Sequence, residues 1–577
     1  MRREYRKPEL LAALGQTRHA ADMAVNYARN YSHPCPWDLD LPSLSMPDLL
    51  QQAVAQAGED PFIDFLGRRY TYSEIFAQAR RFAAGLQARG IGKGERIGLF
   101  LPNVPTYPAA YYGAMMAGAV VVNFSPLYTV EELSQQVADS GTRLLVTVDL
   151  EALLPTALEV LDASALEGLV VGRFASQLSK LKGIALRLFK RDMLHAVPDR
   201  GDVTDWDAFG SDQPLEPVVI DPEQDLALLQ YTGGTTGTPK GAMLTHQNLT
   251  ANARQINAID PRAHERDMIM GVLPLFHVFA NACVLNRTVV NRGCIAMLPR
   301  FDAKDTLATI QRTKATAMPG VPTMYQALLD HKDFAATDFT SLRACIAGGA
   351  PLSAALKTKF EAGSGARLLE GYGLTESSGV VSTNSYEGEE RVGTIGQPIP
   401  RTEVRLVDKE DATRPAPEGE PGELVVRGPQ IMRGYWNRPD AAKRAFTEDG
   451  WLRTGDVAEI DGDGFIMIVD RVKDMIAVGG FKVFPSQVED VLLAHEGVKE
   501  ALVIGVPDDY LGERVEAYVV LDPEEETLDA ETLRDWANEH LGKHERIADL
   551  TIRDDLPKTM IGKLDRKALR AEVLGTD

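Results

Sequence analysis

At positions 231–241 the chain reads Tyr231-Thr232-Gly233-Gly234-Thr235-Thr236-Gly237-Thr238-Pro239-Lys240-Gly241. Three glycines within five residues let the backbone turn tightly and direct N–H groups at an anion. Threonine hydroxyls add donors, and Lys240 adds a cation. The stretch therefore predicts a phosphate-binding loop, with a mobile surface turn as the alternative. It is not a Walker A loop, because Gly241 follows the lysine where that motif has Ser or Thr.

The loop follows one of a series of short apolar runs between residues 90 and 370 that alternate with helical patterns. The predicted strands are 96–101, 120–124, 143–148, 225–231, 294–298, 342–347 and 367–370. The apolar stretch 109–122 contains Gly113 and Gly118 and is too short to span a bilayer, so it predicts a buried helix followed by a buried strand. Apolar strands that alternate with helices favour largely parallel α/β sheets covered on both faces.

The pattern changes near residue 390. Residues 402–407 and 422–427 alternate apolar and polar side chains, which predicts a small antiparallel β-rich segment. A last unit follows Asp470, with predicted strands at 501–506 and 515–521 and a helix at 531–541. It is long enough to fold as a separate domain. We therefore expect a large N-terminal domain at 1–470, with its β-rich segment at about 390–470, and a small mobile C-terminal domain at 471–577.

Composition limits the function classes. With 61 Lys and Arg against 82 Asp and Glu, the 577-residue chain has a formal charge of −21, which disfavours nucleic acid as a partner. Four cysteines without C-x-x-C spacing predict reduced, mostly buried thiols and a cytoplasmic protein. The basic segment Met1–Lys7 leads into no apolar stretch, so we expect no signal peptide.

Four further motifs follow in order: Glu370-Gly371-Tyr372-Gly373-Leu374-Thr375-Glu376, Trp451-Leu452-Arg453-Thr454-Gly455-Asp456, Asp470-Arg471-Val472-Lys473-Asp474-Met475-Ile476 and Pro557-Lys558-Thr559-Met560-Ile561-Gly562-Lys563. With these, residues 60–570 resemble the adenylate-forming superfamily of acyl-CoA synthetases, peptide-synthetase adenylation domains and firefly luciferase. The resemblance implies an α/β fold whose large N-terminal domain has two α/β subdomains and a β-rich, barrel-like segment. It implies a small α+β C-terminal domain.

The resemblance also implies a site for ATP and Mg²⁺. Tyr372 would stack on adenine, Asp456 and Arg471 would bind the ribose, and Glu376 would hold Mg²⁺. Lys563 would act as the catalytic cation between the attacking carboxylate and the α-phosphate. The full ATP or AMP set is Thr232, Gly233, Gly234, Thr235, Thr236, Gly237, Thr238, Lys240, Gly349, Ala350, Glu370, Gly371, Tyr372, Gly373, Thr375, Asp456, Arg471 and Lys563. The catalytic set is Lys563, Glu376, Thr236 and His277.

By the same resemblance, His277, Gly348 and Gly349 border the acyl carboxylate. Gly479, Gly480 and Phe481 line the channel for the pantetheine arm of coenzyme A, and Asp470 is the hinge between the domains. Taken alone, several of these residues have simpler interpretations. Tyr372 would be a core residue, Lys563 a surface charge, Asp456 a turn residue and His277 a structural histidine.

Two features bear on the substrates. Residues 275–280 contain no carboxylate to pair with an ammonium group, which disfavours an amino acid. Only 14 residues follow Lys563, so we expect free coenzyme A as the acceptor instead of a fused carrier domain. The segments 230–236, 242–246 and 465–485 resemble those of bacterial long-chain fatty acid–CoA ligases, which implies a long-chain fatty acid as the substrate. The alternatives are an aryl- or medium-chain acyl-CoA ligase, a fatty acyl-AMP ligase and a catalytically inactive nucleotide-binding protein.

A basic and apolar segment at 178–191 raises the question of membrane contact. Lys180, Lys182, Arg187, Lys190 and Arg191 accompany apolar residues at 181, 184, 188 and 189. The pattern is typical of peripheral binding to the inner face of a membrane, with an ordinary amphipathic surface helix as the alternative. The sequence also leaves a homodimer open.

Overall fold

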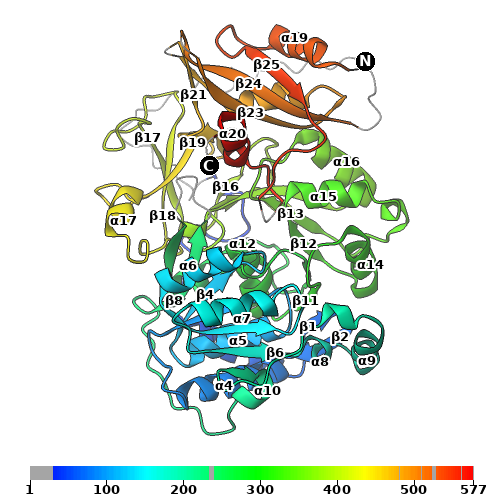
Figure 1. Cartoon of the computed structure of the whole chain (residues 1–577). Coiled ribbons are helices and arrows are strands. Elements are labelled where there is room, and N and C mark those ends of the chain that lie inside the picture. The colour runs from blue at the N-terminus through cyan, green and yellow to red at the C-terminus, as the bar shows by residue number, and fades with distance from the viewer. Residues whose placement is uncertain are drawn as a thin grey trace.

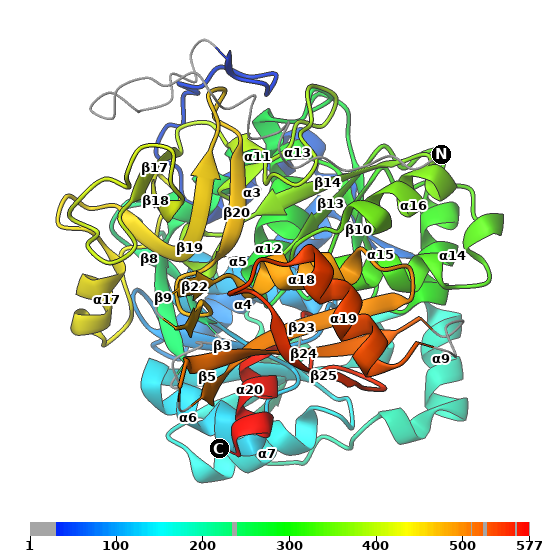
Figure 2. The same cartoon turned by 90° about the horizontal axis from the view of Figure 1, so that it is seen from above.

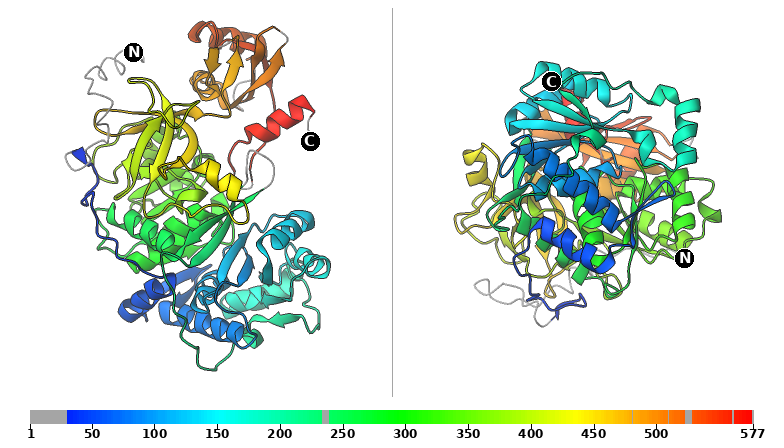
Figure 3. Two further views of the ribbon diagram at one scale, coloured as in Figure 1. Left: turned by 90° about the vertical axis from the view of Figure 1, so that its left-hand side faces the viewer. Right: turned by 90° about the horizontal axis from the view of Figure 1, so that it is seen from below.

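The computed structural model describes residues 30–232, 239–479, 481–508, 510–522, 528–559 and 562–575. These residues form four β-sheets, and helices cover the two larger ones (Figure 1). In Figure 3, the beginning of the chain (blue and cyan), its middle (green) and its C-terminal part (orange-red) follow one another along the molecule. The fold is mixed α/β, with a large N-terminal part and a small C-terminal part, as the sequence predicted.

The first α/β layer is a seven-stranded sheet in the order β7-β6-β5-β3-β4-β8-β9. Its neighbouring strands are parallel except for β8 and β9. The strands are β3 (Arg96–Phe100), β4 (Val120–Phe124), β5 (Thr142–Val148), β6 (Gly168–Gly172), β7 (Val203–Asp205), β8 (Leu226–Thr232) and β9 (Lys240–Thr245). Its helices include α4 (Tyr72–Gln87), α5 (Thr106–Met116), α6 (Val130–Ser140), α7 (Leu154–Ala163) and α10 (Trp206–Phe209). Every residue of α5 is buried, which confirms the buried helix and strand predicted at 109–122.

The second layer is a nine-stranded sheet in the order β16-β15-β14-β13-β12-β10-β11-β1-β2. Its central strands are parallel, and β2, β15 and β16 pair antiparallel at the two edges. The strands are β1 (Pro61–Phe65), β2 (Arg68–Thr71), β10 (Met268–Gly271), β11 (Cys294–Met297), β12 (Ala317–Gly320), β13 (Ala344–Gly348), β14 (Arg367–Tyr372), β15 (Ser382–Thr383) and β16 (Gln397–Pro398). Its helices include α3 (Met46–Ala57), α11 (His246–Ala258), α13 (Arg287–Asn291), α14 (Ala303–Thr313), α15 (Pro322–Leu329) and α16 (Ala354–Ser364).

Local sequence signals determine where several of these helices begin. The Thr129 hydroxyl accepts a hydrogen bond from the Glu132 amide, and the Glu132 carboxylate accepts one from the Thr129 amide, so this capping box starts α6. Thr71 and Glu74 start α4 in the same way.

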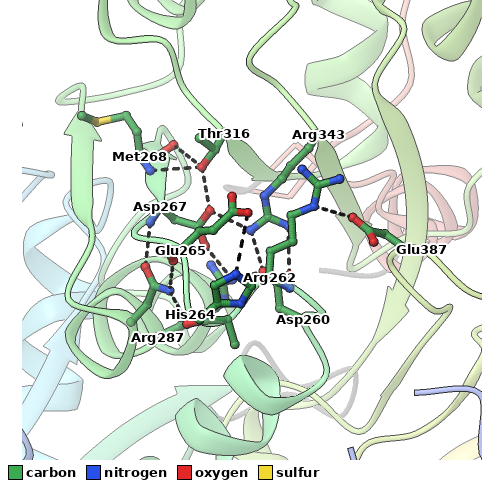
Figure 4. Close-up of polar contacts among 12 residues, drawn as sticks. Asp260, Arg262, His264, Glu265, Asp267, Met268, Arg287, Thr316, Arg343 and Glu387 are labelled. Carbon is green, nitrogen blue, oxygen red and sulfur yellow. Dashed lines mark hydrogen bonds and ion pairs between the residues drawn. The ribbon is translucent and has the colours of Figure 1, made fainter. Parts of the chain in front are cut away.

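A buried ion cluster joins the amino ends of neighbouring strands in the nine-stranded sheet (Figure 4). Arg287 contacts Asp260 at 2.6 Å and Asp267 at 2.8 Å, and Arg343 contacts Asp260 at 2.7 Å and Asp267 at 2.8 Å. The Thr316 hydroxyl also donates to Asp267, at 2.7 Å. Each of three cluster residues directly precedes a strand: Asp267 precedes β10, Thr316 precedes β12 and Arg343 precedes β13. Two carboxylates and two guanidinium groups balance in charge, which makes their burial tolerable.

The predicted antiparallel segment is a four-stranded sheet in the order β17-β18-β19-β20. Its strands are β17 (Glu403–Val407), β18 (Gly422–Arg427), β19 (Leu452–Ile460) and β20 (Ile466–Arg471), and α17 (Pro439–Ala445) lies between β18 and β19. Residues between 390 and 402 include β16, which belongs to the nine-stranded sheet.

The C-terminal part has a sheet and a core of its own. Its strands are β21 (Ile476–Val478), β22 (Phe481–Val483), β23 (Val498–Asp508), β24 (Gly512–Leu521) and β25 (Ile547–Ile552). Its helices are α18 (Pro485–Leu493), α19 (Ala530–His540) and α20 (Arg566–Leu574). One hydrophobic cluster runs from Ile476 to Leu550 within this part. Seen from above, the orange-red elements lie over the N-terminal part (Figure 2).

Candidate functional site

The candidate site lies at the carboxyl ends of β13 and β14, where open α/β sheets commonly bind ligands. The two strands are adjacent and parallel, and Gly348 pairs with Gly371 at their ends. Gly349 and Ala350 follow β13, while Tyr372 ends β14 and Gly373 follows it. The sequence motifs at 347–350 and 370–376 are therefore neighbours in space, although about 20 residues separate them in the chain.

Lys563 reaches this edge from the C-terminal part. A methyl group on Gly349, whose φ is +85°, would come within 2.7 Å of the Lys563 Nζ atom, so the lysine lies directly over the glycine. Two hydrogen bonds fix the loop between Thr559 and Lys563. The Thr323 hydroxyl of α15 donates to the Gly562 carbonyl at 3.1 Å. The Thr559 amide donates to the Lys563 carbonyl at 2.7 Å and closes the loop. Burial, and then the charge of Arg471, lower the pKa of Lys563 to about 8.

Asp456, Arg471 and Tyr372 form one polar group beside that lysine. Asp456 on β19 pairs with Arg471 on β20, and the Arg471 Nε atom is 3.3 Å from the Asp456 Oδ1 atom. The Tyr372 hydroxyl donates to the other Asp456 oxygen. Burial raises the pKa of Asp456 above its usual range, and Arg471 opposes this. The structure thus brings together the residues predicted to bind ribose, adenine and the reacting phosphate.

Glu376 lies in the short 3₁₀ turn Thr375–Ser377 and is held by a segment that the sequence analysis missed. The Tyr435 hydroxyl donates to the Glu376 Oε1 atom at 2.6 Å, and the Met432 amide donates to the Glu376 carbonyl at 2.8 Å. The same tyrosine ring lies 5.3 Å from the Lys240 Nζ atom. No spacing in the sequence links residue 435 to residues 240 and 376, so only the folded chain reveals Tyr435.

The predicted phosphate loop is described only at its two ends. Thr232 ends β8, Lys240 begins β9, and the two residues pair across these antiparallel strands. The residues between them for which we predicted phosphate contacts lie outside the described residues: Gly233, Gly234, Thr235, Thr236, Gly237 and Thr238.

His277 and Glu370 are the other titratable residues predicted for the site. Burial, and then the charge of Lys563, lower the pKa of His277 to about 3, so this histidine is neutral at physiological pH. Its Nδ1 atom accepts a hydrogen bond from the Phe279 amide at 3.3 Å. Burial raises the pKa of Glu370 to about 7, and its carboxylate accepts from the Leu352 amide at 3.3 Å. The pKa values of both side chains therefore differ from those of exposed side chains of the same type.

The residues predicted for the coenzyme A channel and the hinge lie in or next to the C-terminal part. Phe481 is 62% exposed and contacts the His544 ring, while the Gly479 amide donates to the Leu511 carbonyl at 2.8 Å. Gly480 lies outside the described residues. The Asp470 carboxylate accepts from the Ser486 amide at 2.9 Å, which joins the end of β20 to the first turn of α18.

The described residues offer few ligands to a divalent cation, so a bound substrate would supply others. Among the described residues, no group of three or more His, Cys, Asp or Glu side chains could hold a metal ion. Mg²⁺ usually takes one or two protein carboxylates together with substrate phosphates and water. Glu376, with one oxygen bonded to Tyr435, fits that limited role.

The chain is similar to known proteins over most of its length. The family described as "AMP-binding enzyme" matches residues 50–436, and "AMP-binding enzyme C-terminal domain" matches residues 487–563. A long-chain-fatty-acid–CoA ligase of Bacillus subtilis is 37% identical over 94% of this chain and 97% of its own length. A feruloyl-CoA synthase of Amycolatopsis is 35% identical over 87% of this chain and 94% of its own length. The crystal structure of ATP-bound MatB from Rhodopseudomonas palustris has a TM-score of 0.79 at 29% identity and covers 92% of this chain and 99% of that chain. Since its family model covers most of its length, the chain belongs to the AMP-binding enzyme family.

Proposed function

We propose that this chain is an AMP-forming acid–thiol ligase that converts a long-chain fatty acid to acyl-AMP and pyrophosphate, and then to acyl-CoA and AMP. The observation that carries the proposal is the position of Lys563 over Gly349, beside Asp456 and Arg471. A lysine from one part of the chain thereby meets a carboxylate and an arginine suited to a ribose and a phosphate. The similarity to long-chain-fatty-acid–CoA ligases supports the choice of acid.

In the first half-reaction, a carboxylate oxygen of the acid bonds to the α-phosphorus of ATP, and the bond to pyrophosphate breaks. The Lys563 ammonium reduces the repulsion between the two anions and stabilises charge in the transition state. Asp456 accepts hydrogen bonds from the ribose hydroxyls, and Arg471 adds a donor beside them. Glu376, together with the phosphates, would hold Mg²⁺, which would supply charge neutralisation when bound. His277, neutral at physiological pH, places no charge against the acyl carboxylate.

In the second half-reaction, the thiol of coenzyme A attacks the acyl carbon and AMP leaves. We propose that the small domain, residues 471–577, turns about Asp470 between the two steps. This would withdraw Lys563 and bring Gly479, Gly480 and Phe481 toward the acyl-adenylate. The separate core of the C-terminal part and the exposure of Phe481 support this proposal. Two ion pairs to the N-terminal part, Lys499–Asp330 at 3.7 Å and Lys482–Glu410 at 2.9 Å, lie at the surface, where ion pairs are weak.

The substrate is tested by measuring AMP release from ATP with coenzyme A across acids from acetate to oleate, plus benzoate and coumarate. The highest turnover with long-chain acids is the expected result. A maximum with aromatic acids would favour the second candidate, an aryl-CoA ligase, which the similarity to feruloyl-CoA synthase motivates. Acyl-AMP that accumulates whether or not coenzyme A is added would indicate a fatty acyl-AMP ligase. ATP binding without AMP release would indicate an inactive nucleotide-binding protein.

The low pKa of Lys563 predicts a pH dependence of the first half-reaction. The active form is the ammonium, and kcat/KM reports ionisations of the free enzyme, so kcat/KM for ATP should fall as the pH rises above about 8. The Lys563→Arg variant keeps its charge to above about pH 12 and should lose this basic limb, whatever its absolute rate. A limb that persists in the variant would assign the ionisation to another group. Glu370, with a pKa of about 7, is the nearest alternative.

We further propose that helix α9 (Lys180–Phe189) binds anionic membrane where the fatty acid is collected. Gly183 and Leu186 face the protein, and Gly183 packs against the Ala175 carbonyl. The other apolar side chains point outward: Leu181 and Phe189 are each 83% exposed, and Leu188 is 69% exposed. In Figure 1 the helix lies at the margin of the molecule, next to α8 (Phe174–Gln177). An ordinary amphipathic surface helix would bury those side chains.

The charge of this segment also supports membrane binding, because five cations accompany these apolar side chains in a chain of net charge −21. Each Lys or Arg near an anionic bilayer contributes about 1 kcal/mol, so changing residues 180, 182, 187, 190 and 191 to Gln should weaken binding to phosphatidylglycerol vesicles at least about tenfold. A matched variant changes five exposed cations elsewhere, namely Arg80, Lys359, Lys443, Arg444 and Lys567. Equal flotation of both variants would contradict the assignment.

We propose that the protein acts in the cytoplasm, at the inner face of the membrane. Among the described residues we find no helix with the length and apolar character needed to cross a bilayer. The four cysteines are free thiols, as a reducing compartment requires. The homodimer stays a prediction, and sedimentation velocity on the purified protein decides it.

A further inference from the structure

The segment that contains Tyr435 bonds to the base of the phosphate loop. It runs between β18 and α17 and pairs with β9: the Met243 amide donates to the Gly434 carbonyl at 2.9 Å, and the Trp436 amide donates to the Gly241 carbonyl at 2.8 Å. The segment is therefore tied to the strand that starts at Lys240, at the positions that directly follow this lysine.

The other end of the same segment, at Arg438, is anchored to Asp139 of α6. Arg438 contacts Asp139 at 2.6 Å, and the Trp436 indole N–H donates to the Asp139 carbonyl at 3.2 Å. The Tyr231 hydroxyl donates to the same Asp139 carboxylate at 2.7 Å. Tyr231 directly precedes Thr232 on β8. The segment is therefore bonded directly to β9 and, through Asp139, to β8, the two strands that flank the phosphate loop.

The middle of the segment holds Glu376. The Met432 amide donates to the Glu376 carbonyl, which fixes the position of the 3₁₀ turn. The Tyr435 hydroxyl donates to the Glu376 carboxylate, which fixes the position of that group. The hydroxyl donates to Oε1 and therefore restricts the rotation of the carboxylate group. The ring of Tyr435 lies 5.3 Å from the Lys240 ammonium, within the range of a cation–π contact.

We propose that Tyr435 is a positioning residue that orients the Glu376 carboxylate toward the metal ion of a bound metal–ATP complex and sets its distance from Lys240. The proposal rests on the proposed function, in which Glu376 holds Mg²⁺. Groups that hydrogen-bond to a metal-binding carboxylate fix its orientation, and their loss commonly lowers metal affinity by about 10- to 100-fold. Burial and the neighbouring carboxylate raise the pKa of Tyr435, so the hydroxyl stays a donor at physiological pH.

The test is Tyr435→Phe in the full-length protein, since this change removes the hydroxyl and keeps the ring. Calorimetric titration of ATP at a series of Mg²⁺ concentrations should show that the variant needs about tenfold more Mg²⁺ for half-maximal ATP affinity. The first half-reaction should show the same shift in Mg²⁺ requirement and recover at high Mg²⁺. The KM for the fatty acid and the melting temperature should stay unchanged.

Tyr518→Phe is the matched control, because it removes a tyrosine-to-glutamate hydrogen bond of 2.9 Å, to Glu516, in the C-terminal part. Glu376→Gln serves as the reference for loss of the metal carboxylate. If Glu376→Gln raises the Mg²⁺ requirement and Tyr435→Phe does not, the positioning role is wrong and the proposed function stands. If neither variant changes it, the metal role of Glu376 itself is wrong. A lower melting temperature in Tyr435→Phe without a Mg²⁺ shift would show that the residue is only structural.

Discussion

Lys563→Ala should slow acyl-AMP formation by about 10²- to 10³-fold and leave thioester formation from supplied acyl-AMP within a few-fold of the unaltered protein. Among the described residues, the lysine lies over Gly349, beside Asp456 and Arg471. Its ammonium stabilises charge that develops when two anions react. In the second half-reaction the thiol attacks the acyl carbon, and negative charge develops on the acyl oxygen and on the departing AMP. The proposed rotation has by then withdrawn Lys563, so this step should not need it.

The two half-reactions are measured separately. Pyrophosphate–ATP exchange in the presence of the acid reports the first, and AMP release from synthetic acyl-AMP and coenzyme A reports the second. Lys567→Ala, which changes an exposed lysine four residues further on in α20, is the control and should affect neither. Equal losses in both half-reactions would contradict the proposed domain rotation, because Lys563 would then serve both steps from one position.

Arg287→Ala should destabilise the N-terminal part by about 3–5 kcal/mol, since it leaves two buried carboxylates with a single guanidinium group. The Arg287 side chain is 4% exposed, and those of Asp260 and Asp267 are 0% and 1% exposed, so water cannot replace the lost partner. Arg343 would still link the amino ends of β10 and β13 through Asp267, and the opposite end of β13 carries the site.

Arg262→Ala is the matched control, because Arg262 forms an ion pair with Glu387 at 2.6 Å that is about half exposed on both sides (Figure 4). Exposed pairs contribute about 0–1 kcal/mol. Urea unfolding followed by tryptophan fluorescence should give a much lower midpoint for Arg287→Ala than for Arg262→Ala. Similar midpoints would mean that the buried cluster contributes no more than a surface pair.

Much of the fold could be predicted from sequence because its signals are local. The strand 120–124 was predicted with its observed ends. The predicted strands 96–101 and 143–148 differ from the observed strands by one residue at one end, and 225–231 differs by one residue at each end. Apolar runs bounded by glycine and polar residues report burial directly. The separate core of the C-terminal part was likewise foreseeable, since a stretch of about 100 residues with its own strands and helices can bury its own apolar faces.

The candidate site was found by motif, but its connections were not. Lys563 and Gly349, or Tyr372 and Asp456, are far apart in the chain, and the motifs alone say only that they belong to one family of sites. Tyr435 carries no motif signal at all, because its role depends on a segment that returns to pair with β9. The outward direction of α9 was equally hidden, since the spacing of Leu181, Ile184 and Leu188 fits a buried face as well as an exposed one.

The sequence by itself determined the α/β class, the order of the elements, the phosphate-loop composition and the family resemblance, since each is encoded by neighbouring residues along the chain. Only the tertiary structure decided that Lys563 lies over Gly349, that Tyr435 holds Glu376 beside Lys240, and that two arginines neutralise Asp260 and Asp267 inside the protein. These contacts join residues from distant strands and loops. They exist because burying the apolar faces of the sheets brings those strand ends together, and no local pattern encodes that approach.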